Sequence, residues 1–452
     1  MRILLTNWNL NSRGGTESVI RDIALGLRAR DHIPVLYATS LGPAADELKA
    51  AGIPVTDDLA RIGEAPDIIH AHHFFTTGEA LIRFPRTPAI QVCHGWGSVL
   101  ERPPRFPQIR RYVAVSDCTR DNIVNREGIA PERATILPNA VDLTRIPERP
   151  DPLPERPGHA LAFTSQPHLP ILPALRDACQ ARGISLATMG LGRDDPLPER
   201  TLVACDLVFA TGRSAIEALC AGCAVITCDV NGLGGLVTPD NYDRFRRHNF
   251  ALRSLVNPVT AESVGTEIDR YDRPSSEAVS ARMRAEADLD IYLDRLIELY
   301  HAAIEDHRAK PAAEDDIAQA VQRFLHESLP RWPHDGEWGR NGGGGAQPEA
   351  DPASPPNDMD LRVHVDRLME LYRSAIEDER ADRAAKEIAE RVRNGHGSAP
   401  VPDGEHLARL EADLAAHRAA LAEIRGSTSW RISAPLRWIG RALGRGRGAG
   451  AL

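Results

Sequence analysis

Residues 206–232, "DLVFATGRSAIEALCAGCAVITCDVNG", place one carboxylate, Glu217, among small and apolar residues. The apolar run "DLVFAT" predicts a strand that ends at Gly212, where a helix follows, so the first amides of that helix face the carboxyl end of a sheet. Such a terminus attracts phosphate. Arg213 and the amides would hold a diphosphate, while Glu217, about one turn further on, would accept hydrogen bonds from ribose hydroxyls. This arrangement suits a sugar nucleotide.

The same helix allows a purely structural interpretation. Ser214 is followed three residues later by Glu217, which matches the sequence pattern of a capping box. In that motif the glutamate caps its own helix. The helix alone does not decide between a ribose contact and a cap.

Arginine is the only residue that can supply a fixed cation in this region. The chain has three lysines, Lys49, Lys310 and Lys386, so none lies between residues 50 and 309. Arg213 is our first candidate for the cation. Arg193, beside the turn "GLG" that begins at Gly190, is the alternative, and we assign Gly190 to the donor side of the site.

Metal binding finds little support in the sequence. Of the seven cysteines, the closest set is Cys220, Cys223 and Cys228, which lacks a fourth ligand or a histidine at metal-like spacing. We interpret them as buried thiols in a reducing compartment. The triplets "DLD" at 288–290 and "DMD" at 358–360 precede helical patterns and are interpreted as helix-start charges. We expect neither a metal nor an organic cofactor.

Two alternations of strand and helix must position these residues. Residues 1–150 contain strand-like runs such as "RILLT" and "DIIHAH", and the segment "GTESVIRDIALGLRAR" has apolar residues at helical spacing. After a proline-rich link the alternation restarts, and beyond Arg273 the pattern becomes helical. We assign residues 151–310, with this closing helix, to a second domain on the donor side. Strand and helix in alternation predict parallel, doubly wound sheets. The simplest architecture is an α/β chain with two Rossmann-like domains facing each other across a cleft.

Composition excludes several classes of protein. Acidic residues outnumber basic ones, 63 to 54, so a nucleic-acid footprint spread over the surface is not expected. The apolar run near the amino terminus is too short for a secretory signal, and no apolar run reaches the length of a membrane-spanning helix. We expect a cytoplasmic protein.

The carboxyl-terminal third is predicted to be a helical extension. "DRLIELYHAAIEDHRA" from Asp294 returns as "DRLMELYRSAIEDERA" from Asp366, with a glycine- and proline-rich linker between them. Leucines further on are spaced as in a short coiled coil, which would allow helical self-association. The segments that we predict are a helix and flexible linker at 311–357, the repeated helix at 358–394, the coiled coil at 405–425 and a basic tail at 426–452.

The basic tail has an amphipathic pattern. From Pro435 a helix would place Leu436, Trp438 and Ile439 on one side and arginines on the other. Tryptophan with arginine suits the surface of an anionic membrane. We therefore predict a peripheral contact with the inner face of the membrane, with packing on the protein's own body or a disordered tail as the alternative.

Five segments occurring in order resemble the retaining family 4 glycosyltransferases of the GT-B fold, the bacterial glycosyl transferases group 1 type. They are "NSRGGTESVIRDIALGLRARDH", "DIIHAHH", "VCHGWG", "VAVSDCTRDNIVNREGIAPERATILPNAVDL" and "EALCAGCAVITCD". The resemblance covers roughly residues 1 to 305, and its most specific piece is similar to the family's Ser-x-x-Thr … Pro-Asn-x-Val-Asp passage. It implies a transferase that uses a nucleotide sugar.

The resemblance also implies roles for particular residues. Gly14 and Gly15 match the glycine pair that lets the backbone approach the donor diphosphate. His94 matches the histidine at the reaction centre, and Glu217 matches the second glutamate of the family's E-x7-E motif, the ribose contact. The histidines that resemble a common "HxH" strand end are interpreted as cleft lining: His70, His72 and His73.

The chain departs from the family pattern at two places. The first glutamate of the motif falls at Phe209, which cannot form hydrogen bonds, and the family's Arg and Lys pair is replaced by Thr164, Ser165 and Gln166. Arg213 would then stand in for the lost cation, where charge develops on the leaving diphosphate.

Three functions remain open at this point. The first is transfer of a sugar from a nucleotide diphosphate donor to a glycan or lipid-linked acceptor, with retention, in cell-surface polysaccharide synthesis. The second is a degenerate transferase that binds a nucleotide or glycan or acts as a scaffold. An epimerase on the same fold is the third.

Overall fold

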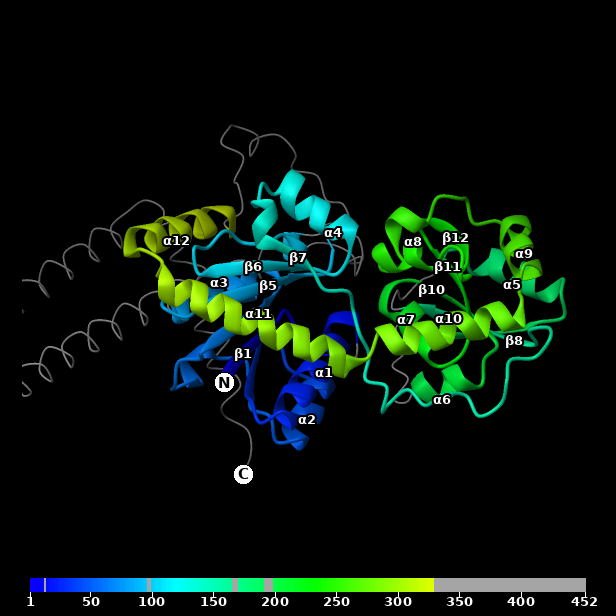
Figure 1. The fold of residues 1–452 in the computed structure, drawn as a ribbon, viewed down its shortest axis with the longest axis horizontal. Helices are drawn as coiled ribbons and strands as arrows, with labels where there is room; N and C mark the ends of the chain where they lie inside the picture. The colour runs from blue at the N-terminus through cyan, green and yellow to red at the C-terminus, as the bar shows by residue number, and fades with distance from the viewer. Residues whose placement is uncertain (12–13, 96–98, 165–169, 191–197, 329–452) are drawn as a thin grey trace, which may run out of the picture. The chain divides into compact units, whose positions relative to one another are not determined.

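The protein contains two separate β-sheets (Figure 1). The structure is a computed structural model that describes residues 1–11, 14–95, 99–164, 170–190 and 198–328. The segments predicted as repeated helix (358–394), coiled coil (405–425) and basic tail (426–452) lie outside the described residues. Two Rossmann-like sheets of this kind confirm the predicted α/β, GT-B fold class.

The first sheet is seven-stranded and parallel, in the order β3-β2-β1-β4-β5-β6-β7. Its central strands are apolar runs that are buried almost throughout, as expected for strands covered by helices on both faces. The strands are β1 (Arg2–Asn7), β2 (Ile33–Ala38), β3 (Val55–Thr56), β4 (Ile68–His72), β5 (Ala89–Cys93), β6 (Ile109–Ala114) and β7 (Ala134–Ile136).

Helices of the first sheet follow the predicted periodicity. In α1 the apolar residues at 19, 20, 23, 24 and 27 are all buried, so the helical face predicted from their spacing is confirmed. The helical elements of this part are α1 (Gly15–Ala29), α2 (Pro43–Ala50), η1 (Leu59–Arg61), α3 (Phe74–Arg83), η2 (Val99–Glu101), α4 (Asp117–Asp121), the π-helical turn η3 (Asn122–Arg126) and η4 (Pro131–Arg133).

The second sheet has five strands in the order β12-β11-β10-β8-β9, all parallel except β12, which is antiparallel to β11. Its strands are β8 (His159–Thr164), β9 (Ser185–Gly190), β10 (Leu207–Ala210), β11 (Ala224–Asp229) and β12 (Gly232–Leu236). Its helical elements are α5 (Leu172–Gln180), α6 (Pro198–Val203), α7 (Gly212–Cys220), α8 (Tyr242–Arg247), η5 (Leu252–Ser254), α9 (Ala261–Asp269) and α10 (Arg273–Glu286).

The chain passes between the sheets twice, and the two passages are hydrogen-bonded to each other. The amide of Val141 donates to the carbonyl of Ala287 at 2.9 Å, and the amide of Leu289 donates back to the carbonyl of Val141 at 3.1 Å. Asp288 caps the helix α11 (Leu289–Ala309) by accepting from the amide of Asp290 at 2.8 Å. The interpretation of "DLD" as helix-start charges is therefore confirmed.

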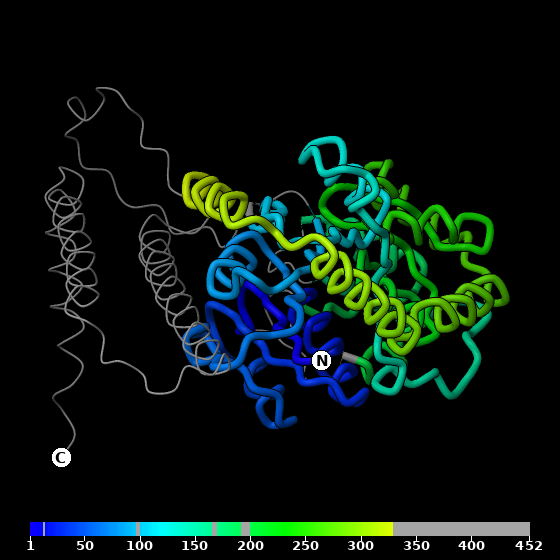
Figure 2. Tube along the Cα trace, turned by 60° about the vertical axis from the view of Figure 1, so that its left-hand side comes forward, coloured from blue at the N-terminus to red at the C-terminus, as the bar shows by residue number. Residues whose placement is uncertain are grey.

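Helix α11 packs on the core of the first sheet. Figure 2 shows the chain returning from the green second part to the blue first part through this helix. Buried residues of α11 join the cluster formed by β1, α1 and β5, among them Leu293, Leu296 and Tyr300. Our sequence analysis grouped residues up to 310 with the second domain, whereas the apolar face of α11 is buried against the first.

Helix α12 (Glu314–Ser328) also covers the first sheet. Its buried Val321 and Phe324 pack in the cluster that contains α3, and the Phe324 ring lies 4.9 Å from the ring of Phe74. The helix predicted within 311–357 thus belongs to the amino-terminal core.

Two further findings concern the chain as far as it is described. All seven cysteines are free and buried, as interpreted from the sequence. Among the described helices, none has both the length and the apolar character needed to cross a bilayer.

We predict that α11 contributes strongly to the stability of the first sheet. Leu293 is fully buried, so Leu293→Ala should lower the free energy of unfolding by about 2 to 5 kcal/mol. The matched control on the same helix is Ile291→Ala, because Ile291 is 43% exposed and its truncation should cost less than about 0.5 kcal/mol. Urea unfolding measures both changes, and equal losses would contradict the packing of α11 described here.

Candidate functional site

Helix α7 begins where strand β10 ends, as the sequence predicted. Gly212 has φ of +58°, a left-handed conformation that glycine adopts without steric cost and that turns the chain from strand into helix. The N-cap residue, Thr211, makes no side-chain capping hydrogen bond. The positive end of the helix is thus available for a ligand with negative charge.

Glu217 pairs with Arg213 instead of capping the helix. The Nε of Arg213 donates to Glu217 Oε1 at 2.8 Å, an i,i+4 pair on α7. The helix begins at Gly212, so Glu217 lies too far along it to occupy the third position of a capping box. The capping alternative is therefore wrong. Glu217 keeps 16% of its side chain exposed, and no described residue donates to its Oε2.

The guanidinium of Arg213 is held on three sides. Besides Glu217, it donates to the carbonyl of Ala140 at 3.1 Å and to the carboxylate of Asp22 on α1. Our sequence analysis expected Arg213 to face the donor diphosphate, and the structure shows its donors shared among these protein partners.

Asp22 is the residue of this network that sequence reasoning missed. Its side chain is 1% exposed and accepts from Arg213, from Arg145 at 3.1 Å and from Arg21 at 3.3 Å. Arg145 also pairs with Glu199 at 2.5 Å. The signal in the sequence was a single acid on the apolar face of a predicted helix, because such a buried charge requires cationic partners.

Burial and charge shift the pKa values of this network in opposite directions. Burial raises the pKa of Glu217, and the neighbouring Arg213 only partly offsets it. Burial alone would lower the pKa of Arg213, but the charges of Asp22 and Glu217 outweigh it, so its pKa lies above the ordinary value. Arg213 is therefore a permanent cation.

The glycine pair lies at the start of α1, after strand β1. Gly14 is the N-cap residue and Gly15 is the first residue of the helix. A Cβ at Gly14 would collide with the carboxylate of Glu17, whereas nothing lies within 4 Å of a Cβ at Gly15. Burial raises the pKa of Glu17. A carboxylate thus lies at the helix terminus where the resemblance places a diphosphate.

Four histidines gather at the carboxyl ends of the neighbouring strands β4 and β5. The Nε2 atoms of His70 and His72 lie 2.9 Å apart, and the His72 ring lies 4.6 Å from the ring of His94 at 75°. His73 accepts from the amide of Trp8 through Nδ1 at 3.0 Å. The predicted cleft-lining histidines and the candidate catalytic His94 therefore form one cluster.

The histidine cluster is neutral and incompletely hydrogen-bonded. Burial lowers the pKa of His70 and of His94 to about 3, and that of His73 to about 4. The charge of Arg213 adds to the lowering for His94, so the two candidate catalytic residues lie within electrostatic reach of each other. His94 Nε2 is buried and has no hydrogen-bond partner among the described residues. That ring nitrogen is thus a buried polar atom that no described residue satisfies.

The remaining candidate residues contribute less. Gly190 ends β9 with φ of +89°, and the turn that follows, with Arg193, lies outside the described residues. Phe209 is 2% exposed in β10 and packs in the core of the second sheet, so it makes no polar contact at the site. Thr164 ends β8, whereas Ser165 and Gln166 lie outside the described residues.

Comparison with known protein families adds one finding. Residues 13–145 match the model of Glycosyltransferase Family 4. The matched segment runs from the glycine pair through β7 to Arg145, and so contains His94 and Asp22. Together with the two Rossmann-like sheets, the match supports a GT-B glycosyltransferase. No curated protein matches the chain.

Several solved structures are similar to this chain at low identity. A glycosyltransferase from Rickettsia africae ESF-5 is 13% identical with a TM-score of 0.49, covering 69% of this chain and 99% of that one. Anabaena Alr3699/HepE in complex with UDP and glucose is 14% identical with a TM-score of 0.48, covering 66% and 98%. A putative UDP-N-acetylglucosamine 2-epimerase from Listeria monocytogenes is 14% identical with a TM-score of 0.44, covering 69% and 97%. Their names span transfer and epimerisation, so nothing about this chain's reaction follows from them.

We predict that Arg213 is needed for stability as well as for any chemistry. Arg213→Ala leaves Asp22 buried with less compensation and should lower the free energy of unfolding by about 3 to 5 kcal/mol. The control is Arg270→Ala, because the Arg270 side chain is 54% exposed where it pairs with Glu267, and its loss should cost less than about 1 kcal/mol. Thermal and urea unfolding measure the difference, and two equally stable variants would show that the Asp22 network contributes nothing.

We also predict that the histidine cluster makes stability depend on pH. The pKa values of His70 and His94 are lowered, so their contribution is full above the unfolded value of 6.5 and is lost as the pH falls toward 3. Between pH 7 and 5 each should cost about 2 kcal/mol of unfolding free energy. In His70→Gln the loss over this range should be smaller by about that amount. Identical pH slopes for the wild type and the variant would contradict the buried, neutral state of His70.

Proposed function

We propose that the protein is a retaining glycosyltransferase that moves a sugar from a nucleoside diphosphate sugar to a glycan or lipid-linked acceptor in cell-surface polysaccharide synthesis. The observation that carries this proposal is the family match over residues 13–145. The second sheet supports it independently, because its helix α7 presents an uncapped amino terminus at the carboxyl end of β10.

The donor would be bound mainly by helix termini and by Glu217. The amides at the start of α7 and the open backbone at Gly15 would face the diphosphate. Glu217 has one carboxylate oxygen paired with Arg213, which leaves Oε2 for a ribose hydroxyl. The fixed charge of Arg213 would act on the leaving diphosphate mainly through space, since three of its five N–H donors are bonded to the protein.

His94 would contact the reacting sugar or the acceptor. It is neutral at physiological pH, because burial lowers its pKa to about 3, so it would act as a hydrogen-bonding group rather than as a cation. In a retaining transfer the acceptor hydroxyl enters on the face from which the diphosphate leaves. His94 would then lie near the incoming acceptor hydroxyl, and Arg213 near the leaving diphosphate.

A degenerate transferase is the second candidate. Phe209 fills the position of the first motif glutamate with a buried ring, and Glu17 lies where a diphosphate would approach Gly14. Purified protein that binds a nucleotide but neither hydrolyses nor transfers sugar from any donor in a panel of UDP-, GDP- and dTDP-sugars would favour this candidate. Release of a nucleoside diphosphate that depends on which donor sugar is supplied would favour an active transferase.

The proposed location is the cytoplasm, with peripheral contact at the inner membrane face through residues 426–452. The support for this contact is the amphipathic pattern of the tail alone. Sedimentation with anionic vesicles, with and without those residues, tests it.

We predict that Glu217→Gln weakens nucleotide binding by about 1 to 3 kcal/mol, the range for a lost hydrogen bond to a charged group. Asp22→Asn is the matched control, because it removes the other carboxylate of Arg213 without touching the ribose position. Calorimetric titration with UDP and GDP, alongside thermal unfolding, separates the two. A ribose contact predicts weaker binding only in Glu217→Gln, whereas equal effects in both variants would show that Glu217 merely holds Arg213.

A further inference from the structure

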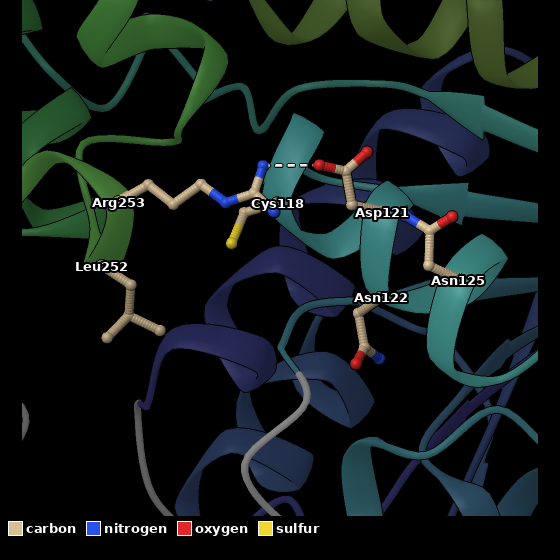
Figure 3. A pocket seen from close by; sticks show the side chains of 6 residues that line it. All are labelled: Cys118, Asp121, Asn122, Asn125, Leu252 and Arg253. Carbon is tan, nitrogen blue, oxygen red and sulfur yellow. Dashed lines mark hydrogen bonds and ion pairs between the residues drawn. The ribbon is translucent and has the colours of Figure 1, made fainter.

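A pocket of about 470 Å³ lies where α4 and η3 of the first part meet η5 of the second. Two residues before η5, the carbonyl of Phe250 accepts from the amide of Gly212 at the start of α7 at 3.3 Å, so the pocket wall adjoins that helix terminus. Its volume is within the range of ligand sites in proteins. Figure 3 shows the side chains that line it: Cys118, Asp121, Asn122, Asn125, Leu252 and Arg253. The sequence analysis singled out none of these residues.

The charges of this pocket cancel. Arg253 donates to Asp121 Oδ2 at 2.5 Å across the pocket, and Figure 3 shows this pair joining η5 to α4. The pocket lining contains no other charged residue. A phosphate would have to compete with Asp121 for Arg253, and a metal ion would have to compete with Arg253 for Asp121. The electrostatics therefore favour a neutral ligand.

The remaining polar groups of the pocket are two amides. Asn122 and Asn125 both belong to the π-helical turn η3, and both line the pocket. Their side chains make no hydrogen bond with a described residue, although Asn122 is half-buried and Asn125 is exposed. Each amide offers both a donor and an acceptor, which is what a hydroxyl group requires of its partner.

Two additional features point to a binding role. π-helical turns occur frequently at functional sites, and here the turn sets both amides at the pocket. Leu252 is 43% exposed in the pocket wall and offers an apolar surface next to the polar groups. A sugar ring presents both kinds of surface, with hydroxyls at its rim and C–H groups on its faces.

We propose that this pocket binds a neutral glycan and is a subsite for the acceptor of the proposed transfer. Of the two acceptor classes named above, the pocket would recognise a glycan and not a lipid. The inference rests on the proposed function, since only a transferase has an acceptor. Asn122 and Asn125 bind hydroxyls, and Leu252 packs against the sugar ring. The Asp121–Arg253 pair holds the two walls together.

The first experiment measures binding without turnover. Maltotriose, cellotriose and chitotriose are titrated into the full chain, with the dissociation constant followed by ligand-observed NMR. At least one of these glycans should bind, and Asn122→Ala and Asn125→Ala should each raise its dissociation constant by about three- to tenfold. Both side chains lie at the surface of the pocket, so neither variant should change the melting temperature. The matched control is Asn257→Ala, because Asn257 is exposed outside the pocket, and it should bind as the wild type does.

The other outcomes decide between this proposal and its alternatives. No binding by any of the three glycans, or unchanged affinity in both asparagine variants, would overturn the glycan subsite. Arg253→Gln should leave the affinity for inorganic diphosphate unchanged, and loss of that affinity would show an anion site instead. Failure of the protein to bind or cleave any nucleotide sugar, with glycan binding intact, would overturn the proposed transfer and leave the pocket as a glycan-binding site.

Discussion

A carboxylate as deeply buried as that of Asp22 must be compensated, and this requirement organises the contact between the two sheets. Asp22 is on α1 of the first part, while Arg213 is on α7 of the second and Arg145 is in the segment that joins them. Removing Arg213 or Arg145 would leave the buried carboxylate of Asp22 with less compensation in a medium of low dielectric constant. The two helices that begin at the proposed donor site are thus tied together a short distance behind it.

This tie determines what the side chains of the site can do. Arg213 bonds to Asp22, Glu217 and a backbone carbonyl, so three of its five N–H donors are directed at the protein. A leaving diphosphate would instead experience its fixed charge together with the amide dipoles of α7. The same α1 carries the glycine pair at its start and Asp22 seven residues later, so a ligand that moved the start of α1 would also strain the ion pairs.

Local features of the sequence predicted much of this structure. The apolar spacing of α1, the strand that ends at Gly212 and the helix start at Asp288 all depend on residues close together in the chain. The pairing of Arg213 with Asp22 could not be predicted, because it joins positions 191 residues apart. The packing of α11 on the first sheet could not be predicted for the same reason. Its apolar face would suit a helix of either domain, and only the long-range contacts show which sheet it covers.

The packing of α11 also reaches the histidine cluster. Tyr300, fully buried on α11, has its hydroxyl 2.7 Å from His70 Nδ1, and His70 in turn contacts His72 through Nε2. If the hydroxyl donates, His70 must carry its proton on Nε2 and donate to His72, whose proton then lies on Nδ1. That nitrogen is buried without a partner among the described residues, as is His94 Nε2. With that donor arrangement, the helix that closes the first core sets, through the imidazole of His70, the tautomer of His72, the ring that packs against His94.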